Sequence, residues 1–269
     1  MRPDKKIRTP GQKKSWRRIC LQLLPGIFIV LVWQYAADRW ISSAFLGMPS
    51  RIVIRLYEYI ASGRMLVDTW VTAKEVFFGY IIGGGIGLFA GYVLGRSPRL
   101  NEIFNPYIVA FYGIPKVALA PIFIIWFGLG LWSKVAVAAL MVYFQVFYYT
   151  YLGMISLNEE FVNLSRIMGA SPTRVTTTIV LPSTLPFIFT GFKTSVPYAV
   201  IGAIVGEFTA SNKGLGYFIL YSGSIFDSAG LFAGVFVLVG FVLTVNWLLE
   251  RAERKYMPWK RIEGPGVGE

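Results

Sequence analysis

The sequence predicts an all-α membrane protein with six transmembrane helices. Two observations lead to this fold class. Of the 269 residues, 55% are hydrophobic and only 15% are charged, and the mean hydropathy is +0.57. This composition is too apolar for an ordinary soluble domain. The apolar residues also gather in runs of about 20 residues, the length that a helix needs to cross a bilayer.

The chain is expected to form one transmembrane domain over residues 19–255, after a basic arm at 1–18 and before a short tail at 256–269. The first apolar run also fits a secretory signal, but it is long enough to span the bilayer, so we expect a retained helix. The six expected spans cover about residues 19–37, 69–95, 104–127, 135–151, 185–208 and 231–249.

Two local patterns predict how the first half of the chain packs. Residues 50–60 have the spacing of an amphipathic helix, with Ile52, Leu56, Tyr59 and Ile60 on one side. In the second span, glycines recur at every fourth position, which leaves a ridge without side chains and lets another helix approach closely. These helix-packing glycines are Gly79, Gly83, Gly87, Gly91 and Gly95.

Prolines predict the shape of the third span, which contains Pro106, Pro115 and Pro121. A proline inside a transmembrane helix frees carbonyl groups, which then need partners from protein or water. We therefore expect this span to be kinked and to face the interior of the protein.

The distribution of basic residues predicts the orientation in the membrane. Residues 1–18, 96–102, 155–185 and 250–269 hold 17 of the 26 Lys and Arg residues, whereas the three other connecting segments hold 6. By the positive-inside rule the first four segments, and hence both termini, are cytoplasmic. The clustering at the chain ends suits a membrane face better than a nucleic-acid groove, so no nucleic-acid partner is expected.

The longest polar interval between two apolar runs covers residues 156–182, on the predicted cytoplasmic side. Leu157, Phe161, Leu164 and Met168 recur within it at helical spacing and fall on one face of a helix. This pattern is typical of a folded segment rather than of a slack loop.

Three residues predict a sharp turn in the middle of this interval. Gly169 is expected to end the first helix, because glycine adopts the left-handed conformation of a C-terminal cap at little steric cost. Ser171 can accept a hydrogen bond at the start of a second short helix, and Pro172 suits its first position. A helix, a turn and a second helix form a shape that can insert into a partner protein.

The sequence argues against an enzyme. There is no histidine, which excludes Ser-His-Asp and Cys-His catalysis and His-ligated metal sites. Glu159 and Glu160 are adjacent, and adjacent helical residues point about 100° apart, too far to flank one substrate. The phosphate-binding pattern G-x-x-x-x-G-K-[ST] does not occur. We therefore predict no catalytic residue, no metal and no cofactor in this chain.

Polar residues within the apolar runs are candidates for a translocation pathway. Ionisable groups at membrane depth cost about 2.5–3.5 kcal/mol on insertion scales, so they usually face partners or water. The candidates are Lys116, Gln145, Lys193 and Glu207. Lys116 is either a cation beside the path of an anion or a side chain that reaches to the interface. Lys193 and Glu207 lie near opposite ends of one span and also fit a structural role.

The turn and its flanks resemble a known motif. Gly169, followed after nine residues by Ile179-Val180-Leu181-Pro182, resembles the EAA loop of ABC importer permeases. The spacing matches throughout, but the positions of Glu-Ala-Ala hold Asn163-Leu164-Ser165. This departure does not change the helix–turn–helix logic, although a contact that needs the acidic residue would differ.

Other stretches narrow the resemblance. Residues 45–50 (FLGMPS), 114–118 (IPKVA), 126–128 (WFG) and 214–216 (GLG) look like the permeases for nitrate, taurine, alkanesulfonates and bicarbonate. The similarity covers residues 19–255.

The resemblance implies a type I ABC importer permease fold in the bacterial inner membrane. It also implies a homodimer of permeases, two ATPase subunits that bind ATP and Mg²⁺, and a periplasmic or lipid-anchored substrate-binding protein. A small anion is the implied substrate; the alternatives are another organic solute, such as a pyrimidine precursor, and a self-sufficient channel or secondary carrier. The residues implied to couple to the ATPase are Arg166, Met168, Gly169, Ala170, Ser171, Pro172 and Arg174.

Overall fold

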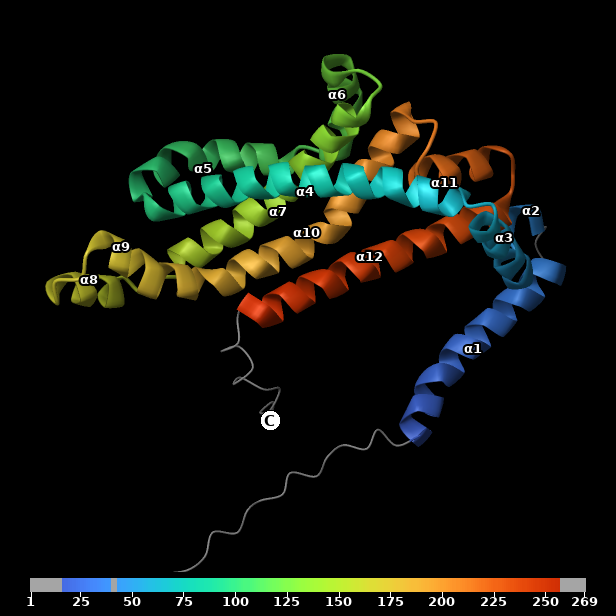
Figure 1. The fold of residues 1–269 in the computed structure, drawn as a ribbon, viewed down its shortest axis with the longest axis horizontal. Helices are drawn as coiled ribbons and strands as arrows, with labels where there is room; N and C mark the ends of the chain where they lie inside the picture. The colour runs from blue at the N-terminus through green and yellow to red at the C-terminus, as the bar shows by residue number, and fades with distance from the viewer. Residues whose placement is uncertain (1–15, 40–42, 257–269) are drawn as a thin grey trace, which may run out of the picture.

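A computed structural model describes residues 16–39 and 43–256, and every regular element in these ranges is helical (Figure 1). The expected arm at 1–18 and tail at 256–269 fall almost entirely outside the described residues. The elements are α1 (Trp16–Arg39), α2 (Ser43–Leu46), α3 (Pro49–Ala61), α4 (Arg64–Arg96), α5 (Pro98–Gly113), η1 (Lys116–Leu119), α6 (Ala120–Phe127), α7 (Leu131–Ile155), α8 (Glu159–Ile167), α9 (Pro172–Val175), η2 (Thr176–Val180), α10 (Leu181–Ala210), α11 (Leu215–Ser224) and α12 (Ser228–Tyr256).

Four helical segments are long and apolar enough to cross a membrane: α4, α7, the continuous stretch from α9 to α10, and α12. The pair formed by α5 and η1–α6 is a fifth candidate. In α1 the apolar part of the described residues runs over Leu24–Ala37, which is shorter than a full span. The count of six spans and the placement of both termini therefore remain predictions.

The expected third span at 104–127 is not one kinked helix. It consists of two helical pieces that meet at an angle of 85°. The pieces are separated by Ile114 and Pro115, whose backbones are extended. Pro115 causes this break because its ring disfavours the helical conformation of the preceding residue. Pro106 is accommodated inside α5, and Pro121 lies in the first turn of α6.

The period-four glycines of α4 lie against α7. A Cβ atom built on Gly87 would lie 2.6 Å from the carbonyl oxygen of Tyr143, and one on Gly91 would lie 2.7 Å from that of Phe147. At Gly83 the added atom would overlap the backbone of Ala139. The ridge without side chains thus allows α4 and α7 to pack backbone to backbone, as a glycine repeat permits in a membrane helix.

The apolar core lies where α4, α7 and α10 meet, with α11 at one end and α12 laid along the outside (Figure 1). Large apolar side chains remain exposed around this core, including Phe28, Ile125 and Phe89. Such an apolar exterior is expected where a protein faces lipid or another subunit. The buried core residues are Val76, Val142, Val146, Ala199, Val200, Ala203, Ile204 and Leu215.

The expected amphipathic helix at 50–60 is α3, which packs on α12 and α4. Ile52 and Tyr59 form its buried side, with 2% and 4% of their surface exposed. Ile60 is 49% exposed, so its predicted place on the same side is wrong. The 100° turn between Tyr59 and Ile60 carries Ile60 away from the bundle.

The fifth span begins earlier than the predicted residue 185. Helices α9, η2 and α10 follow one another without a break over Pro172–Ala210, so the second short helix of the polar interval is the start of this span. The segment η2 is π-helical and leads directly to Pro182. Because Pro182 has no N–H group to donate, a widened turn beside it is an expected accommodation.

Candidate functional site

The polar interval at residues 156–182, called the coupling segment after its expected role, lies at one end of the bundle with α8 and α9 at its tip (Figure 1). The first helix of the segment, α8, is capped by Asn158, whose side-chain oxygen accepts a hydrogen bond from the backbone N–H of Glu160 at 2.8 Å. A side-chain cap of this kind satisfies one of the free N–H groups that every helix start leaves.

The turn has the predicted geometry. Gly169 follows α8 with φ of +83°, in the left-handed region that favours glycine. The hydroxyl of Ser171 accepts a hydrogen bond from the backbone N–H of Arg174 at 3.3 Å, and Pro172 occupies the first turn of α9. No atom lies within 4 Å of a Cβ built on Gly169, so only the backbone conformation requires glycine here.

A small apolar cluster holds the inner side of the coupling segment to the bundle. Val175 and Val180 are buried against Met154, the penultimate residue of α7. Leu157 and Ala170 pack on this cluster. Leu157 precedes α8 and turns inward, so its predicted place on the same face as Phe161 is wrong.

The outer side of the coupling segment is apolar and exposed. Phe161 and Leu164 expose 62% and 54% of their surface, and Ile167 and Met168 expose 83% and 80%. The sequence reasoning missed Ile167, which lies beside the predicted turn. Exposed apolar residues gathered at the tip of a bundle are typical of a protein interaction site.

The structure separates the four polar residues suggested for a pathway. The Lys193 ammonium pairs with Glu253 of α12 at 2.9 Å, and Glu207 belongs to a buried polar cluster described below. The Lys116 ammonium lies 4.4 Å from the centre of the Phe144 ring, next in sequence to the partly buried Gln145. Among the described residues, no hydrogen bond or ion pair joins any two of these four.

Lys116 has no carboxylate partner among the described residues. Its ammonium donates to the backbone oxygen of Tyr112 at 3.0 Å and lies 4.7 Å from the centre of the Tyr112 ring. Aromatic faces attract a cation, but they do not neutralise its charge.

A buried polar cluster lies toward the opposite end of the bundle, where α4, α10 and the start of α11 meet. Glu207 accepts hydrogen bonds from the Thr72 hydroxyl at 2.6 Å and from the N–H groups of Gly216 at 2.5 Å and Tyr217 at 3.3 Å. Thr72 in turn accepts from the N–H of Leu215 at 2.9 Å. These contacts satisfy the free N–H groups at the start of α11.

Asp68 ties the same loop to α3. Its carboxylate accepts hydrogen bonds from the N–H of Gly214 at 2.9 Å and from the Tyr59 hydroxyl at 2.8 Å. Burial raises the pKa of the Tyr59 phenol, and the Asp68 carboxylate raises it further, so the phenol stays protonated and donates. Gly214 has φ of +115°, and any side chain there would meet Glu207.

The sequence reasoning included Glu207 but missed the other polar members of this cluster, Asp68, Thr72, Glu75 and Lys134. The Lys134 ammonium lies 3.3 Å from Glu75 and donates to the Ser211 hydroxyl at 3.0 Å. One signal was available: Asp68, Thr72 and Glu75 recur at i, i+4 and i+7, which places three polar groups on one face of an apolar helix.

The buried polar cluster and the exposed coupling segment together indicate the class of protein. In the described residues the buried carboxylates accept hydrogen bonds or pair with lysine, and the coupling segment carries exposed apolar side chains at its tip. Several helices are long and apolar enough to cross a membrane, as in a multi-pass membrane protein. The chain belongs to the family of binding-protein-dependent transport system inner membrane components, which its residues 83–257 match.

The chain is also similar in sequence to two transport permeases and in fold to one solved structure. It is 32% identical to the formylaminopyrimidine transport permease ThiX of Halalkalibacterium halodurans, covering 87% of this chain and 94% of the relative. It is 28% identical to the putative aliphatic sulfonates transport permease SsuC of Bacillus subtilis, covering 93% and 91%. The fold is similar to a chain of the inward-facing MetNI methionine ABC transporter, with a TM-score of 0.56, 19% identity and coverage of 77% and 97%.

The chain is therefore an ABC importer permease subunit of the inner membrane. Membership of this family implies ATPase and substrate-binding partners and an ATPase activity that lies with the partner subunits. The resemblance to the sulfonate permeases that the sequence suggested is confirmed at the level of the family.

Proposed function

We propose that two copies of this chain form the translocation pathway of an importer for a small anion, and that the coupling segment transmits ATP-driven motion to the pathway. The observation that carries this proposal is the Gly169 turn, which projects an exposed apolar tip from the end of the bundle. ATP and Mg²⁺ are bound by two partner ATPase subunits, and a separate binding protein delivers the substrate to the opposite face.

The proposed mechanism has two states. ATP closes the paired ATPases and carries the two coupling segments together, and the attached spans turn from inward-facing to outward-facing. ATP must bind the closed arrangement more tightly for this to occur, and the coupling is reciprocal. Arg174 is exposed and has no ion-pair partner in the part of the chain that the structure describes, so it is available to an acidic group of the ATPase. Arg166, the other arginine expected to couple to the ATPase, lines a cavity on the inner side of the segment.

Replacement of Gly169 by Val is expected to uncouple ATP hydrolysis from uptake. The left-handed conformation at φ of +83° costs a residue with a Cβ atom about 1–2 kcal/mol, and a β-branched residue more, so the turn relaxes and the tip shifts. Uptake in proteoliposomes with the ATPase and binding protein is expected to fall at least about tenfold while ATP hydrolysis continues.

The matched control is Gly169→Asn, because Asn tolerates the left-handed region. It is expected to keep most of the uptake. Normal uptake by Gly169→Val would show that the turn geometry does not couple the two activities. Omitting the ATPase or the binding protein tests the whole proposal, because uptake by the permease alone would instead indicate a channel or a secondary carrier.

The proposal of an anion as substrate rests on Lys116. Its ammonium has no carboxylate partner among the described residues and lies over the rings of Tyr112 and Phe144. A substrate with negative charge would gain a favourable interaction at this point. The contacts of Lys193 and Glu207 instead support structural roles for those two residues.

Lys116→Gln is expected to raise the KM for uptake of an anion about tenfold, with little change in ATP hydrolysis, because one charge interaction of about 1.4 kcal/mol is lost. Lys116→Arg keeps the charge and serves as the control. An equal KM for the wild type and Lys116→Gln, measured by uptake of a radiolabelled sulfonate, would remove the basis of the anion proposal.

A second candidate substrate is a neutral pyrimidine precursor, favoured by the 32% identity to a permease named for formylaminopyrimidine. The two candidates are separated by the ligand affinities of the binding protein that works with this permease. Tight binding of a formylaminopyrimidine and no binding of sulfonates would favour the second.

A further inference from the structure

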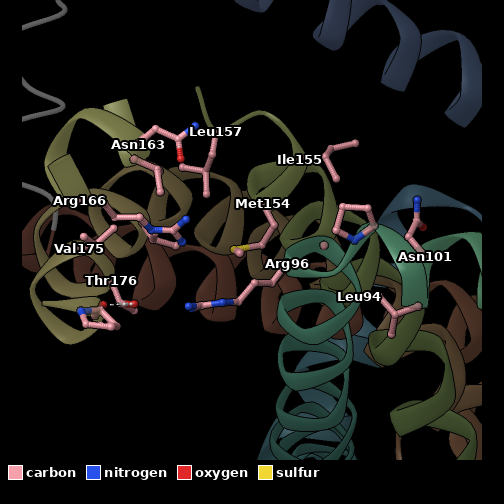
Figure 2. A pocket seen from close by; sticks show the side chains of 15 residues that line it. Leu94, Arg96, Asn101, Met154, Ile155, Leu157, Asn163, Arg166, Val175 and Thr176 are labelled. Atoms are coloured by element: carbon pink, nitrogen blue, oxygen red, sulfur yellow. Dashed lines mark hydrogen bonds between the residues drawn. The ribbon is translucent and has the colours of Figure 1, made fainter. Parts of the chain in front are cut away.

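A cavity of about 700 Å³ lies behind the coupling segment, between its inner side and the turn that joins α4 to α5. Figure 2 shows side chains from both segments around this space. Arg96 and Asn101 line it from the α4–α5 side, and Asn163 and Arg166 line it from α8. The cavity is distinct from the exposed tip at Met168, which does not line it.

The charge of the cavity is positive. Two of its lining residues are arginines, and none is Asp or Glu. In Figure 2 the guanidinium groups of Arg96 and Arg166 extend from opposite walls toward the same space. Arg96 is held in place by the hydroxyl of Tyr92 at 2.5 Å, while Arg166 makes no ion pair with any described residue.

Both arginines are exposed, and no carboxylate among the lining residues neutralises them, so an anion in this space would be attracted by two cations. Each presents a planar fork of N–H donors that matches the oxygens of a phosphate group. Inorganic phosphate offers four oxygens and up to two negative charges, and the phosphodiester of a phospholipid offers two unesterified oxygens and one negative charge. Either can accept from the two forks and from the neighbouring Asn101 and Asn163 amides.

The remaining walls of the cavity are largely apolar, and they include Met154, Val162 and Val175. An apolar wall beside a pair of cations is the environment of a lipid headgroup at a membrane surface. The same cavity can also hold a free phosphate that makes its polar contacts with the arginine and asparagine side chains and none with the apolar wall.

We propose that this cavity binds a phosphate group through Arg96 and Arg166, carried either by an anionic phospholipid or by inorganic phosphate. The bound group bridges the end of α4 to α8 and thereby fixes the coupling segment against the bundle. Occupancy therefore changes how readily the segment moves with its ATPase partner.

The experiment uses the complete transporter in nanodiscs and two probes. In the first arm, phosphatidylglycerol retained after transfer to phosphatidylcholine nanodiscs is counted by native mass spectrometry. In the second arm, inorganic phosphate is titrated into the phosphatidylcholine sample and the rise in melting temperature is recorded. The variants are Arg96→Gln, Arg166→Gln and their combination.

The control is Arg99→Gln, because Arg99 lies in the same α4–α5 turn but does not line this cavity. The double variant is expected to lose at least about tenfold in affinity for the probe, while Arg99→Gln keeps it. Each single variant is expected to lose part of that affinity, which keeps the test valid if the double variant does not fold.

The two arms identify the source of the phosphate. Arginine-dependent retention of phosphatidylglycerol alone indicates a lipid, and an arginine-dependent response to inorganic phosphate indicates a free anion; both support the site. Three results would overturn it. The first is binding in neither arm. The second is binding that Arg96→Gln and Arg166→Gln weaken no more than Arg99→Gln does. The third is loss of the ATPase subunit from Arg96→Gln and Arg166→Gln with no change in either probe.

Discussion

Gly83→Val is expected to abolish the folded permease. A side chain at this position would overlap the backbone of Ala139, so α4 and α7 could not keep their contact. Overpacking of a tight helix contact costs about 1–3 kcal/mol and more when backbone must move. Because α4 and α7 form the centre of the bundle, we expect little monodisperse protein after extraction into detergent.

The matched control for this change is Gly85→Val in the same helix. No atom lies within 4 Å of a Cβ built on Gly85, and Val is a better helix former than Gly. Gly85→Val should therefore be recovered at the wild-type level, measured by fluorescence-detected size exclusion of tagged protein. Equal yields of the two variants would contradict the close approach of α4 and α7.

Glu207→Ala is expected to destabilise the permease by about 3 kcal/mol or more. The change removes the acceptor of the buried Gly216 N–H and the partly buried Tyr217 N–H, and each such group costs about 1–3 kcal/mol. The Thr72 hydroxyl also loses Glu207 but can still donate to the backbone oxygen of Asp68 at 3.2 Å. A thermal unfolding curve in detergent, followed by circular dichroism, measures the effect as a lower melting temperature.

Two variants serve as controls for the loss of Glu207. Glu207→Gln keeps an acceptor oxygen and should be less destabilising than Glu207→Ala. Glu58→Ala removes an exposed carboxylate that pairs with Arg55 at 2.9 Å, and such surface pairs contribute about 0–1 kcal/mol. If Glu207→Ala melts no lower than Glu58→Ala, Glu207 does not hold the start of α11.

Features set by local sequence could be predicted. The period of four glycines in α4 defines a ridge whatever it packs against, and Gly169, Ser171 and Pro172 specify a turn through their own backbone preferences. The buried side of α3 was also predicted in part, because Ile52 and Tyr59 follow helical spacing. In each case the residues that decide the structure are a few positions apart.

Features set by distant parts of the chain could not be predicted to the same degree. Three prolines marked the third span, but only Pro115 breaks it, because the helix on either side accommodates the other two. The polar cluster joins Thr72 to Glu207, which are 135 residues apart. No local pattern indicates that pairing, although the spacing of polar groups in α4 indicates that a pairing exists.

Because α9, η2 and α10 are continuous, the region beside the Gly169 turn and the region around Glu207 belong to one long helical stretch. At about 1.5 Å per residue, the 39 residues from Pro172 to Ala210 reach about 58 Å along the helix. The Gly169 turn lies beside one end of this stretch. Near the other end, Glu207 accepts hydrogen bonds from the N–H groups at the start of α11. In the proposed mechanism, a displacement of about 5 Å at the Gly169 end therefore corresponds to a tilt of about 5° about the other end. The π-helical segment η2 lies near the Gly169 end, and its widened turn is the place where we expect this helix to bend.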